Sequence, residues 1–242
     1  MGLAHSPRIV SSGLMLYLDS FNTKSYIGSG TTWSDISNNR RNCTFYNGPP
    51  TYAGGILTFD GLDDLSQVAS PSGLFSWTPD TTFNQSMTLS VWIKTSDTSG
   101  YIISKAWNGL GQYNYRILPG SFDLVAGTTG TTSNSISFGR SLANGAWVNI
   151  VCWMNSTDMG YYINSNEFSG SKAHLLTNNI PSSGNGNVDL SIMSLYPYGA
   201  GWAGNAAFSV SGNLGIVQIY NRVLSSAEVN QNYAALRGRF GV

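Results

Sequence analysis

Apolar and polar residues alternate along many short runs of this chain. Over Thr88–Lys94, the side chains of Leu89, Val91 and Ile93 fall on one face of an extended segment and Ser90 falls on the other. Such period-two alternation predicts a half-buried β-strand. Runs of the same kind recur at Gly13–Asp19, Ile56–Asp60, Tyr101–Lys105, Phe122–Ala126, Tyr161–Asn164, Val188–Ser194 and Leu214–Tyr220. Clusters of Gly, Asn, Ser and Pro separate these runs, a rhythm typical of an all-β sandwich or jelly roll.

Two segments depart from simple alternation. The run Trp147–Met154 is apolar on both faces, which predicts a central strand that is covered on both sides. Ser225 and Glu228 match a capping box, in which each side chain accepts from the other residue's backbone N–H. Apolar residues follow at helical spacing. The sequence therefore predicts one short helix over 225–237, laid on the sandwich.

The charge of the chain is low and balanced. Its 242 residues include 12 Lys and Arg and 12 Asp and Glu, and only 10% are charged, against roughly 25% in an ordinary soluble domain. This balance provides no field for nucleic acid, and no apolar run reaches the ~20 residues of a membrane-spanning helix. No repeat, charge block or Pro-rich linker divides the sequence, so residues 1–242 are expected to form a single domain.

The N-terminal region and the two cysteines bear on the compartment of the protein. The apolar run at 14–18 is too short for a signal peptide and follows no charged segment. We therefore expect a protein that acts inside a cell, or that leaves by lysis or as part of a particle. Cys43 and Cys152 lie in apolar, strand-like runs, which favours buried thiols, and a disulfide between them is the alternative.

Acidic residues are too sparse for a glycoside hydrolase site. Such a site needs two carboxylates about 5–10 Å apart, yet the glutamates of the chain are Glu167, in a hairpin-like segment, and Glu228, in the helix cap. The two histidines, His5 and His174, fall near a chain end and in a polar loop, where neither is placed to activate a nucleophile. We expect a protein that is not an enzyme.

Oxygen-rich turns are weak candidates for a metal site. Asp60, Asp63 and Asp64 follow one strand closely, and Asp35 lies in a loop with two asparagines. Asp-Gly followed by Asp-Asp indicates first a turn, in which carboxylates accept from backbone amides. A structural Ca²⁺ is the alternative. No Cys/His pattern suits zinc, so no other cofactor is expected.

Aromatic residues with polar neighbours occur in two expected loops. Exposed aromatic rings can stack on the faces of sugars, while amides bond to sugar hydroxyls. The candidate carbohydrate-binding residues are Trp107, Asn108, Tyr113 and Tyr115 in one cluster, and Tyr196, Tyr198 and Trp202 in the other. The alternative is that these rings close the core or a subunit interface. Trp92, Trp147 and Trp153 belong to strand-like runs, where core packing is expected.

The scarcity of charge also favours contact with other proteins. Interface cores lack long charged side chains, so this neutral surface suits packing against partners on a particle or against copies of the chain itself. The two ends offer candidate attachment arms: residues 1–10 with Arg8, and Arg237, Arg239 and Phe240 after the helix. The alternative is two frayed ends.

Seven segments occur in an order that is similar to a known family. They are Leu-Tyr-Leu-Asp at 16–19, Gly-Thr-Thr-Trp-Ser-Asp-Ile-Ser at 30–37, Leu-Thr-Phe-Asp-Gly-Leu-Asp-Asp at 57–64, Leu-Ser-Val-Trp-Ile at 89–93, Trp-Val-Asn-Ile-Val at 147–151, Tyr-Ile-Asn at 162–164 and Gly-Ile-Val-Gln-Ile-Tyr-Asn-Arg-Val-Leu-Ser at 215–225. Their order resembles the concanavalin A-like lectin/glucanase superfamily, in its laminin-G-like jelly-roll branch. The resemblance implies a two-sheet antiparallel jelly roll whose concave sheet or rim loops often bind sugars, sometimes with Ca²⁺.

The ends of the chain carry a narrower resemblance. Residues 4–10 and 233–241 are similar to versions of this module that occur as standalone virion proteins of tailed bacteriophages. This resemblance implies a non-enzymatic structural protein at the virion surface, which decorates the capsid or forms part of a tail fibre. Its partners would be other virion proteins and host glycans, with no nucleic acid or membrane. The alternative is a free-standing, lectin-like carbohydrate-binding module.

Overall fold

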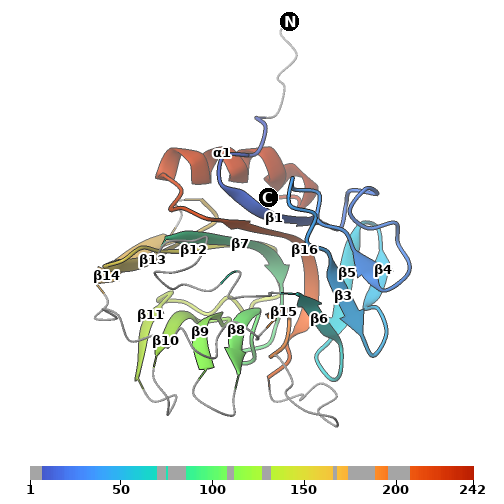
Figure 1. The fold of residues 1–242 in the computed structure, drawn as a ribbon, viewed down its shortest axis with the longest axis horizontal. Coiled ribbons are helices and arrows are strands. Elements are labelled where there is room, and N and C mark those ends of the chain that lie inside the picture. The colour runs from blue at the N-terminus through green and yellow to red at the C-terminus, as the bar shows by residue number, and fades with distance from the viewer. Residues whose placement is uncertain are drawn as a thin grey trace, which may run out of the picture.

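Two antiparallel β-sheets stack face to face in the structure, a computed structural model that describes residues 7–69, 75, 86–107, 112–126, 132–165, 168–173, 189–195 and 208–242. Helix α1 (Ser226–Leu236) lies on the outer side of one sheet (Figure 1). The strand order of this sheet, sheet A, is β14 (Phe168–Ala173), β13 (Asp158–Ile163), β12 (Val148–Met154), β7 (Met87–Lys94), β16 (Ser211–Tyr220), β5 (Ile56–Asp60) and β4 (Thr51–Ala53), with β1 (Leu14–Asp19) beside β16. The order of sheet B is β11 (Thr132–Ser137), β10 (Ser121–Ala126), β9 (Gln112–Ile117), β8 (Ile103–Trp107), β15 (Leu190–Ile192), β6 (Leu65–Val68), β3 (Cys43–Tyr46) and β2 (Thr32–Trp33). The predicted all-β sandwich with one short C-terminal helix is confirmed.

Strand β7 lies in the middle of sheet A, between β12 and β16. Its Val91 is in register with Ile150 of β12 on one side and with Val217 of β16 on the other. Because successive side chains of a strand point to opposite faces, Leu89 and Ile93 share the inner face with Val91, and all three lie in the main hydrophobic core. The face predicted from their alternation is therefore the buried one.

Strand β12 is covered on both sides, as its apolar pattern predicted. Ile150 and Cys152 belong to the main core between the sheets. Val151, on the opposite face, packs in a second cluster with Leu224 and with Val229 of α1. The helix thus supplies the second cover that the sequence required.

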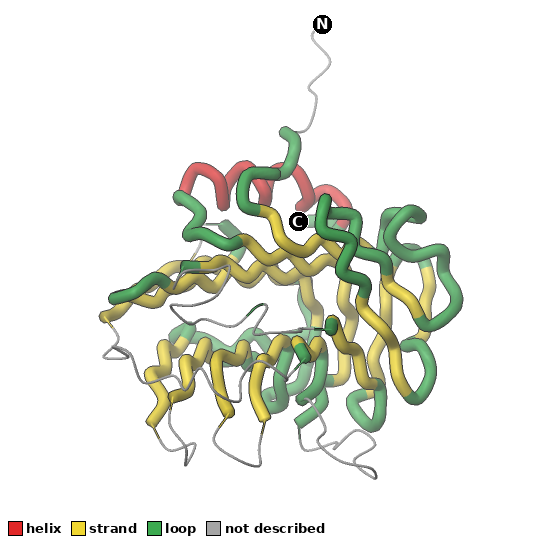
Figure 2. The backbone as a smooth tube through the Cα atoms, viewed as in Figure 1, coloured by secondary structure: helices red, strands yellow, loops and turns green. Residues whose placement is uncertain are grey.

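Sheet B turns an apolar row toward the same core. Ile103, Ile117, Phe122 and Ile136 are in register across β8, β9, β10 and β11, and all four are buried. The two sheets are therefore joined by a continuous hydrophobic core, and Figure 2 shows their strands as two separate layers.

The C-terminal segment closes the outer face of sheet A. The ring of Phe240 stacks on Trp92 with 4.3 Å between centroids and 6° between planes, and Nη1 of Arg239 lies 2.6 Å from Oδ2 of the fully buried Asp19. Phe240 is therefore buried and does not extend as part of an attachment arm, whereas the Arg239 side chain stays 40% exposed beside Asp19. Packing the Phe240 ring on the indole of Trp92 is more favourable than exposing both rings to solvent.

The described part of the N-terminal arm also packs on the body of the protein. The backbone N–H of Val10 donates to Oδ1 of Asn232 at 2.7 Å, and the hydroxyl of Tyr220 donates to the Val10 carbonyl at 3.0 Å. The side chains of Arg8 and Arg237 are exposed on this same side of the molecule. Of the proposed attachment residues, these two are exposed without an ion pair among the described residues, and their role in attachment stays a prediction.

The capping box at the start of α1 is present as predicted. The hydroxyl of Ser225 accepts from the backbone of Glu228, and the Glu228 carboxylate accepts from the backbone N–H of Ser225. Both oxygens of Glu228 also accept from the guanidinium of Arg222, at 2.8 and 2.6 Å. This pairing, together with the Ser225 bonds, lowers the pKa of Glu228 to about 2.

Two further expectations concern the thiols and the membrane. Cys43 in β3 and Cys152 in β12 are free and buried, as the apolar pattern favoured. Over the described ranges, no helix combines the length and the apolar character needed to cross a membrane.

Candidate functional site

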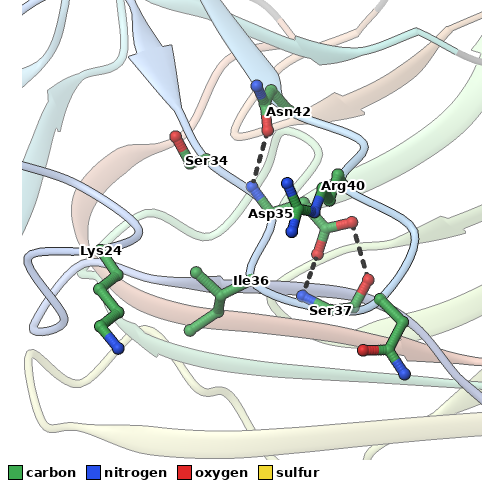
Figure 3. Close-up of a pocket in the computed structure, with 8 residues that line it drawn as sticks. Lys24, Ser34, Asp35, Ile36, Ser37, Arg40 and Asn42 are labelled. Atoms are coloured by element: carbon green, nitrogen blue, oxygen red, sulfur yellow. Dashed lines mark hydrogen bonds between the residues drawn. The ribbon is translucent and has the colours of Figure 1, made fainter.

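A polar pocket of about 540 Å³ opens between two loops that flank β2. The loop from β1 to β2 contributes Lys24, and the loop from β2 to β3 contributes the rest of the lining. The lining residues are Lys24, Ser34, Asp35, Ile36, Ser37, Asn38, Arg40 and Asn42 (Figure 3). Ile36 is the one apolar residue in this lining, so the pocket suits a hydrophilic ligand.

The carboxylate of Asp35 organises the loop that forms the pocket. Asp35 is 4% exposed, and its Oδ1 accepts from the backbone N–H of Tyr17 at 2.9 Å and of Ser37 at 2.8 Å. Its Oδ2 accepts from the Ser37 hydroxyl at 2.8 Å and from the backbone N–H of Arg41 at 2.7 Å. Figure 3 shows the two bonds from Ser37. Four donors occupy this carboxylate, so it is held as a structural anion and not as a general base or calcium ligand.

The same loop is fastened to the edge strand β1. The backbone N–H of Ile36 donates to the Tyr17 carbonyl at 2.9 Å. The amide of Asn39 donates to the carbonyls of Leu14 and Met15, both at 3.2 Å. These bonds satisfy the exposed edge of sheet A, and they hold the pocket wall in one position before any ligand arrives.

Several polar groups of the pocket have no bond to other described residues. The charged ends of Lys24 and Arg40 are exposed and form no ion pair within the described ranges. Asn42 accepts from the backbone N–H of Asp35 through Oδ1 at 3.0 Å, which leaves its amide N–H groups as donors. The pocket therefore combines a fixed frame with free cationic and amide donors.

An aromatic hollow of about 140 Å³ lies on sheet A, near its β14 edge. Its lining consists of Trp153, Tyr161, Tyr162, Ser169, Gly170 and Ser171. The ring of Trp153 lies over Gly160, where a Cβ would come within 2.5 Å of the indole. Tyr161 is buried, while Trp153 and Tyr162 are half-buried. Trp153 therefore departs from the expected core packing, which Trp92 follows, and a partly open indole beside hydroxyls suits a sugar ring.

The outer face of sheet B carries a row of polar residues in register across all of its strands. The row consists of Thr32, Thr44, Gln67, Ser191, Ser104, Arg116, Asp123 and Ser135. Gln67, Ser191 and Ser104 in its middle are buried. Nε of Arg116 pairs with Asp123 at 2.9 Å, so the charges at the other end neutralise each other. This row is less available to a ligand than the pocket.

The described residues of the first predicted aromatic cluster lie in strands and not in a loop. Trp107 lies in β8 and Tyr113 in β9, in register with Gln112 and Ala106 of the partner strands. Tyr115 also lies in β9 and is fully buried in the main core. Its ring cannot meet a sugar there, so the carbohydrate-binding assignment of Tyr115 is corrected. Alternation within β9 places it on the inner face with Ile117.

Four predicted carbohydrate-binding residues lie outside the described residues. They are Asn108 of the first cluster and Tyr196, Tyr198 and Trp202 of the second. Their assignment stays a prediction.

The aspartate that ends β5 and the two that follow it are brought together. Carboxylate oxygens of Asp60, Asp63 and Asp64 lie within 4.8 Å of one another. Asp60 accepts from the backbone N–H of Leu62 at 2.7 Å, and Asp64 accepts from the backbone N–H of Asp60 at 2.9 Å. Partial burial, followed by the charges of Asp60 and Asp63, raises the pKa of Asp64. These bonds are those of the turn that the sequence indicated first.

The pocket residues Lys24, Arg40 and Asn42 were missed at the level of sequence. The sequence does contain a signal for Arg40. Charged residues are scarce in this chain, and Arg40 lies within a few residues of the Trp-Ser-Asp segment at 33–35. Lys24, however, reaches the pocket only through the fold, since a whole strand separates the two loops.

A family model matches residues 72–230, about two thirds of the chain, and is described as the concanavalin A-like lectin/glucanases superfamily. The chain belongs to this superfamily. A search of curated proteins found no match.

Solved structures share the fold of this superfamily member at low identity. One is a mutant of Trypanosoma rangeli sialidase that displays trans-sialidase activity, with a TM-score of 0.61, 13% identity, and coverage of 97% of this chain and 34% of the sialidase. Another is the binding domain of botulinum neurotoxin DC in complex with SialylT, with a TM-score of 0.62, 14% identity, and coverage of 93% and 52%. The binding domain of Paraclostridial mosquitocidal protein 1 has a TM-score of 0.54, 15% identity, and coverage of 91% and 52%. The chain thus spans a third to a half of these neighbours and shares their lectin-like jelly-roll fold.

Proposed function

We propose that the chain is a non-enzymatic structural protein at the surface of a bacteriophage virion, as a capsid decoration or part of a tail fibre, and that it adheres through contacts with glycans. The pocket between the β1–β2 and β2–β3 loops carries this proposal. Its donors are free, whereas the carboxylate of Asp35 accepts four hydrogen bonds. Such a pocket binds a polar ligand without a group that can move a proton.

The surface and the ends of the chain support a place on a particle. Only 10% of residues are charged, and surfaces poor in long charged side chains are less costly to desolvate in a permanent contact. Both ends of the described chain pack beside α1, where Arg8 and Arg237 are exposed. The resemblance of residues 4–10 and 233–241 to standalone virion proteins also supports a structural role on a virion.

A free-standing, lectin-like module is the second candidate. It is favoured by the neighbours that are named as binding domains, one of them solved with SialylT and also with rat synaptotagmin II. In both candidates the polar pocket and the aromatic hollow bind glycans. The candidates differ in whether the outer face of α1 contacts other virion proteins.

The sialidase neighbours raise the alternative of a hydrolase, which the carboxylates of this chain do not favour. Asp35 and Glu228 are each held by several donors, and Asp123 is paired with Arg116. We expect the purified protein to release neither reducing sugar from β-glucans nor free sialic acid from sialyl-lactose. Release that is lost in Glu167→Gln would contradict the non-enzymatic proposal.

Mass spectrometry of purified virions tests the structural role. We expect the chain in every particle, in many copies for a capsid decoration and in few copies for a fibre. Absence from particles, combined with glycan binding by the isolated protein, would instead establish the free-standing module.

A glycan array with wild-type protein tests adhesion. The variant Trp153→Ala should lose ligands that stack on the aromatic hollow, and Asn42→Ala should lose ligands of the polar pocket, each by about tenfold. Thr51→Ala, an exposed change on the edge strand β4, serves as the control. An array without any bound glycan would remove adhesion from the proposal.

A further inference from the structure

We propose that the pocket between the β1–β2 and β2–β3 loops takes an acidic saccharide, whose acidic groups are held by Lys24 and Arg40 from opposite sides of the lining (Figure 3). This proposal rests on the glycan contact proposed above and names the class of glycan. Three observations carry it: the charges that are free in the pocket, the lack of an aromatic platform in its lining, and the backbone of Arg40.

The free charge of the pocket is positive. Lys24 and Arg40 are exposed, and neither forms an ion pair with the other described residues. The single acid of the lining, Asp35, is 4% exposed and directs both oxygens to four donors of its own loop and of β1. An anion entering the pocket therefore meets two cations, while the one negative group is turned away and shielded.

Three other guanidinium groups of the molecule are paired with a carboxylate. Arg116 is paired with Asp123 at 2.9 Å, and Arg239 with Asp19 at 2.6 Å. Arg222 is paired with Glu228 at 2.6 Å. Lys24 and Arg40 have no such partner among the described residues, and they line the same pocket.

The remaining lining selects against a neutral sugar. None of the eight lining residues is aromatic, so the stacking that holds a neutral ring is not available there. Asn38, Asn42 and Ser34 supply amide and hydroxyl groups that suit the hydroxyls of a sugar. Charge must then contribute most of the affinity, and the amides orient the ring.

The backbone of Arg40 carries strain at the rim of the pocket. Its φ is +54°, in the left-handed region where residues with a Cβ are disfavoured. Glycine would adopt this conformation freely. Arginine adopts this unfavourable backbone conformation at the rim of the pocket. Strained residues of this kind often occur at ligand sites.

Matched saccharides test the charge requirement. Isothermal titration calorimetry would compare trigalacturonic acid with its methyl ester, and mannose 6-phosphate with mannose, so that each pair differs only in the acidic group. We expect each acid to bind at least tenfold more tightly than its neutral partner, and this preference to fall as NaCl is raised from 50 to 500 mM. The two pairs distinguish a carboxylate ligand from a phosphate ligand.

Two variants locate the binding. Lys24→Ala and Arg40→Gly should each weaken binding of the acid by about tenfold, the cost of one charge-assisted contact. Because Arg40→Gly relaxes the backbone, its melting temperature should equal or exceed that of the wild type, which excludes unfolding as the cause. Lys172→Ala removes one positive charge from the exposed strand β14 and should bind as the wild type does.

Each other outcome overturns the inference. Equal affinity for the acid and its neutral partner would contradict an acidic ligand in this pocket, and so would unchanged binding by both variants. The broader glycan proposal would remain if Trp153→Ala still loses ligands on the array. Failure of all four saccharides overturns the inference, whereas failure of the whole glycan array removes the adhesive function as well.

Discussion

At the scale of single residues, two ionisable side chains, those of Asp35 and Lys105, are buried inside the protein. Asp35 draws four donors from two segments of chain and so joins the pocket loop to β1. Lys105 is 1% exposed within β8. Neither environment is visible in the sequence, because an aspartate in a polar loop and a lysine at the end of a strand are ordinary on a surface.

Removing the Asp35 carboxylate should loosen the pocket. Asp35→Ala leaves four donors without their acceptor, and we expect a loss of about 3–5 kcal/mol in the free energy of unfolding, measured by urea denaturation. Asp35→Asn keeps one acceptor oxygen and should cost about half as much. Equal losses in both variants would show that the negative charge, rather than the number of acceptors, is what matters.

The buried ammonium of Lys105 predicts a pH dependence. Burial lowers its pKa from 10.5 to about 7, against the opposing effect of Asp189. Between pH 7 and 10.5 the unfolded chain keeps a proton that the native state has lost, so stability should rise with pH in this window, by at most about 1.4 kcal/mol per pH unit. Below pH 7 both states are protonated, and this contribution becomes constant.

Urea denaturation from pH 6 to 8.5 would measure this rise. In Lys105→Met the contribution of the ammonium is gone, so its free energy of unfolding should change less over the same range. Parallel curves for the two proteins would contradict the assignment to Lys105.

At the scale of elements, local chemistry positions α1 on sheet A. Ser225 and Glu228 cap the helix, and the Arg222 guanidinium ties the cap to the end of β16. The capping box could be identified from sequence because its residues are neighbours in the chain. The Arg222 contact spans six residues and depends on the turn between strand and helix.

The cap should contribute measurably to stability. Ser225→Ala is expected to lower the free energy of unfolding by about 1 kcal/mol, whereas Ser226→Ala, one position inside the helix, should change it by less than about 0.5 kcal/mol. Because the pKa of Glu228 is lowered from 4.5 to about 2, its contribution is present above pH 4.5 and is lost as pH falls toward 2. Circular dichroism during acid titration would follow this loss, and an equal acid response in Glu228→Gln would contradict it.

Long alternating strands were predictable, and short polar ones were not. The runs that became β5 and β7 carry a clear apolar face, and the run that became β12 is apolar on both faces. Strand β6 reads Leu-Ser-Gln-Val and is buried throughout, and β2 has two residues. Such segments acquire their structure from neighbours in the sheet, which local periodicity does not report. Tyr115 was assigned to a loop because the sequence did not indicate β9 as a strand. Within β9, which pairs with β8 and β10, alternation places Tyr115 on the inner face.

At the scale of the whole molecule, the C-terminal segment acts as a closing layer. Trp92 stacks with both Phe240 and Tyr233, whose ring centroids lie 4.3 and 5.4 Å from its own. A Cβ on Gly215 of β16 would come within 2.5 Å of the Phe240 ring, so the sheet is shaped to receive it. The sequence indicated the helix but not this return of the chain, because the contact joins residues that are far apart.

Phe240→Ala should therefore destabilise the entire sandwich. We expect a loss of about 3 kcal/mol, from lost burial and the cavity over Trp92, seen as a lower melting temperature. Val242→Ala, at an exposed position two residues on, should change stability by less than about 0.5 kcal/mol. A negligible effect of Phe240→Ala would mean that the last residues are not part of the folded unit.

The family assignment could be made from sequence because it depends on the order of many strand motifs along the chain. The pocket could not, since Lys24 and Arg40 line one pocket only after the β1–β2 and β2–β3 loops come together. Aromatic residues drew attention at the sequence level, whereas the polar pocket is built from residues that are common in any loop.

The ends of the described chain and α1 lie on one side of the sandwich, with sheet B on the other (Figure 1). A linker, a bead or a carrier surface joined to either end would hold the molecule by its helical side. Strands β8 to β11 would then be presented to the medium, and the protein would be oriented for display without any second anchor.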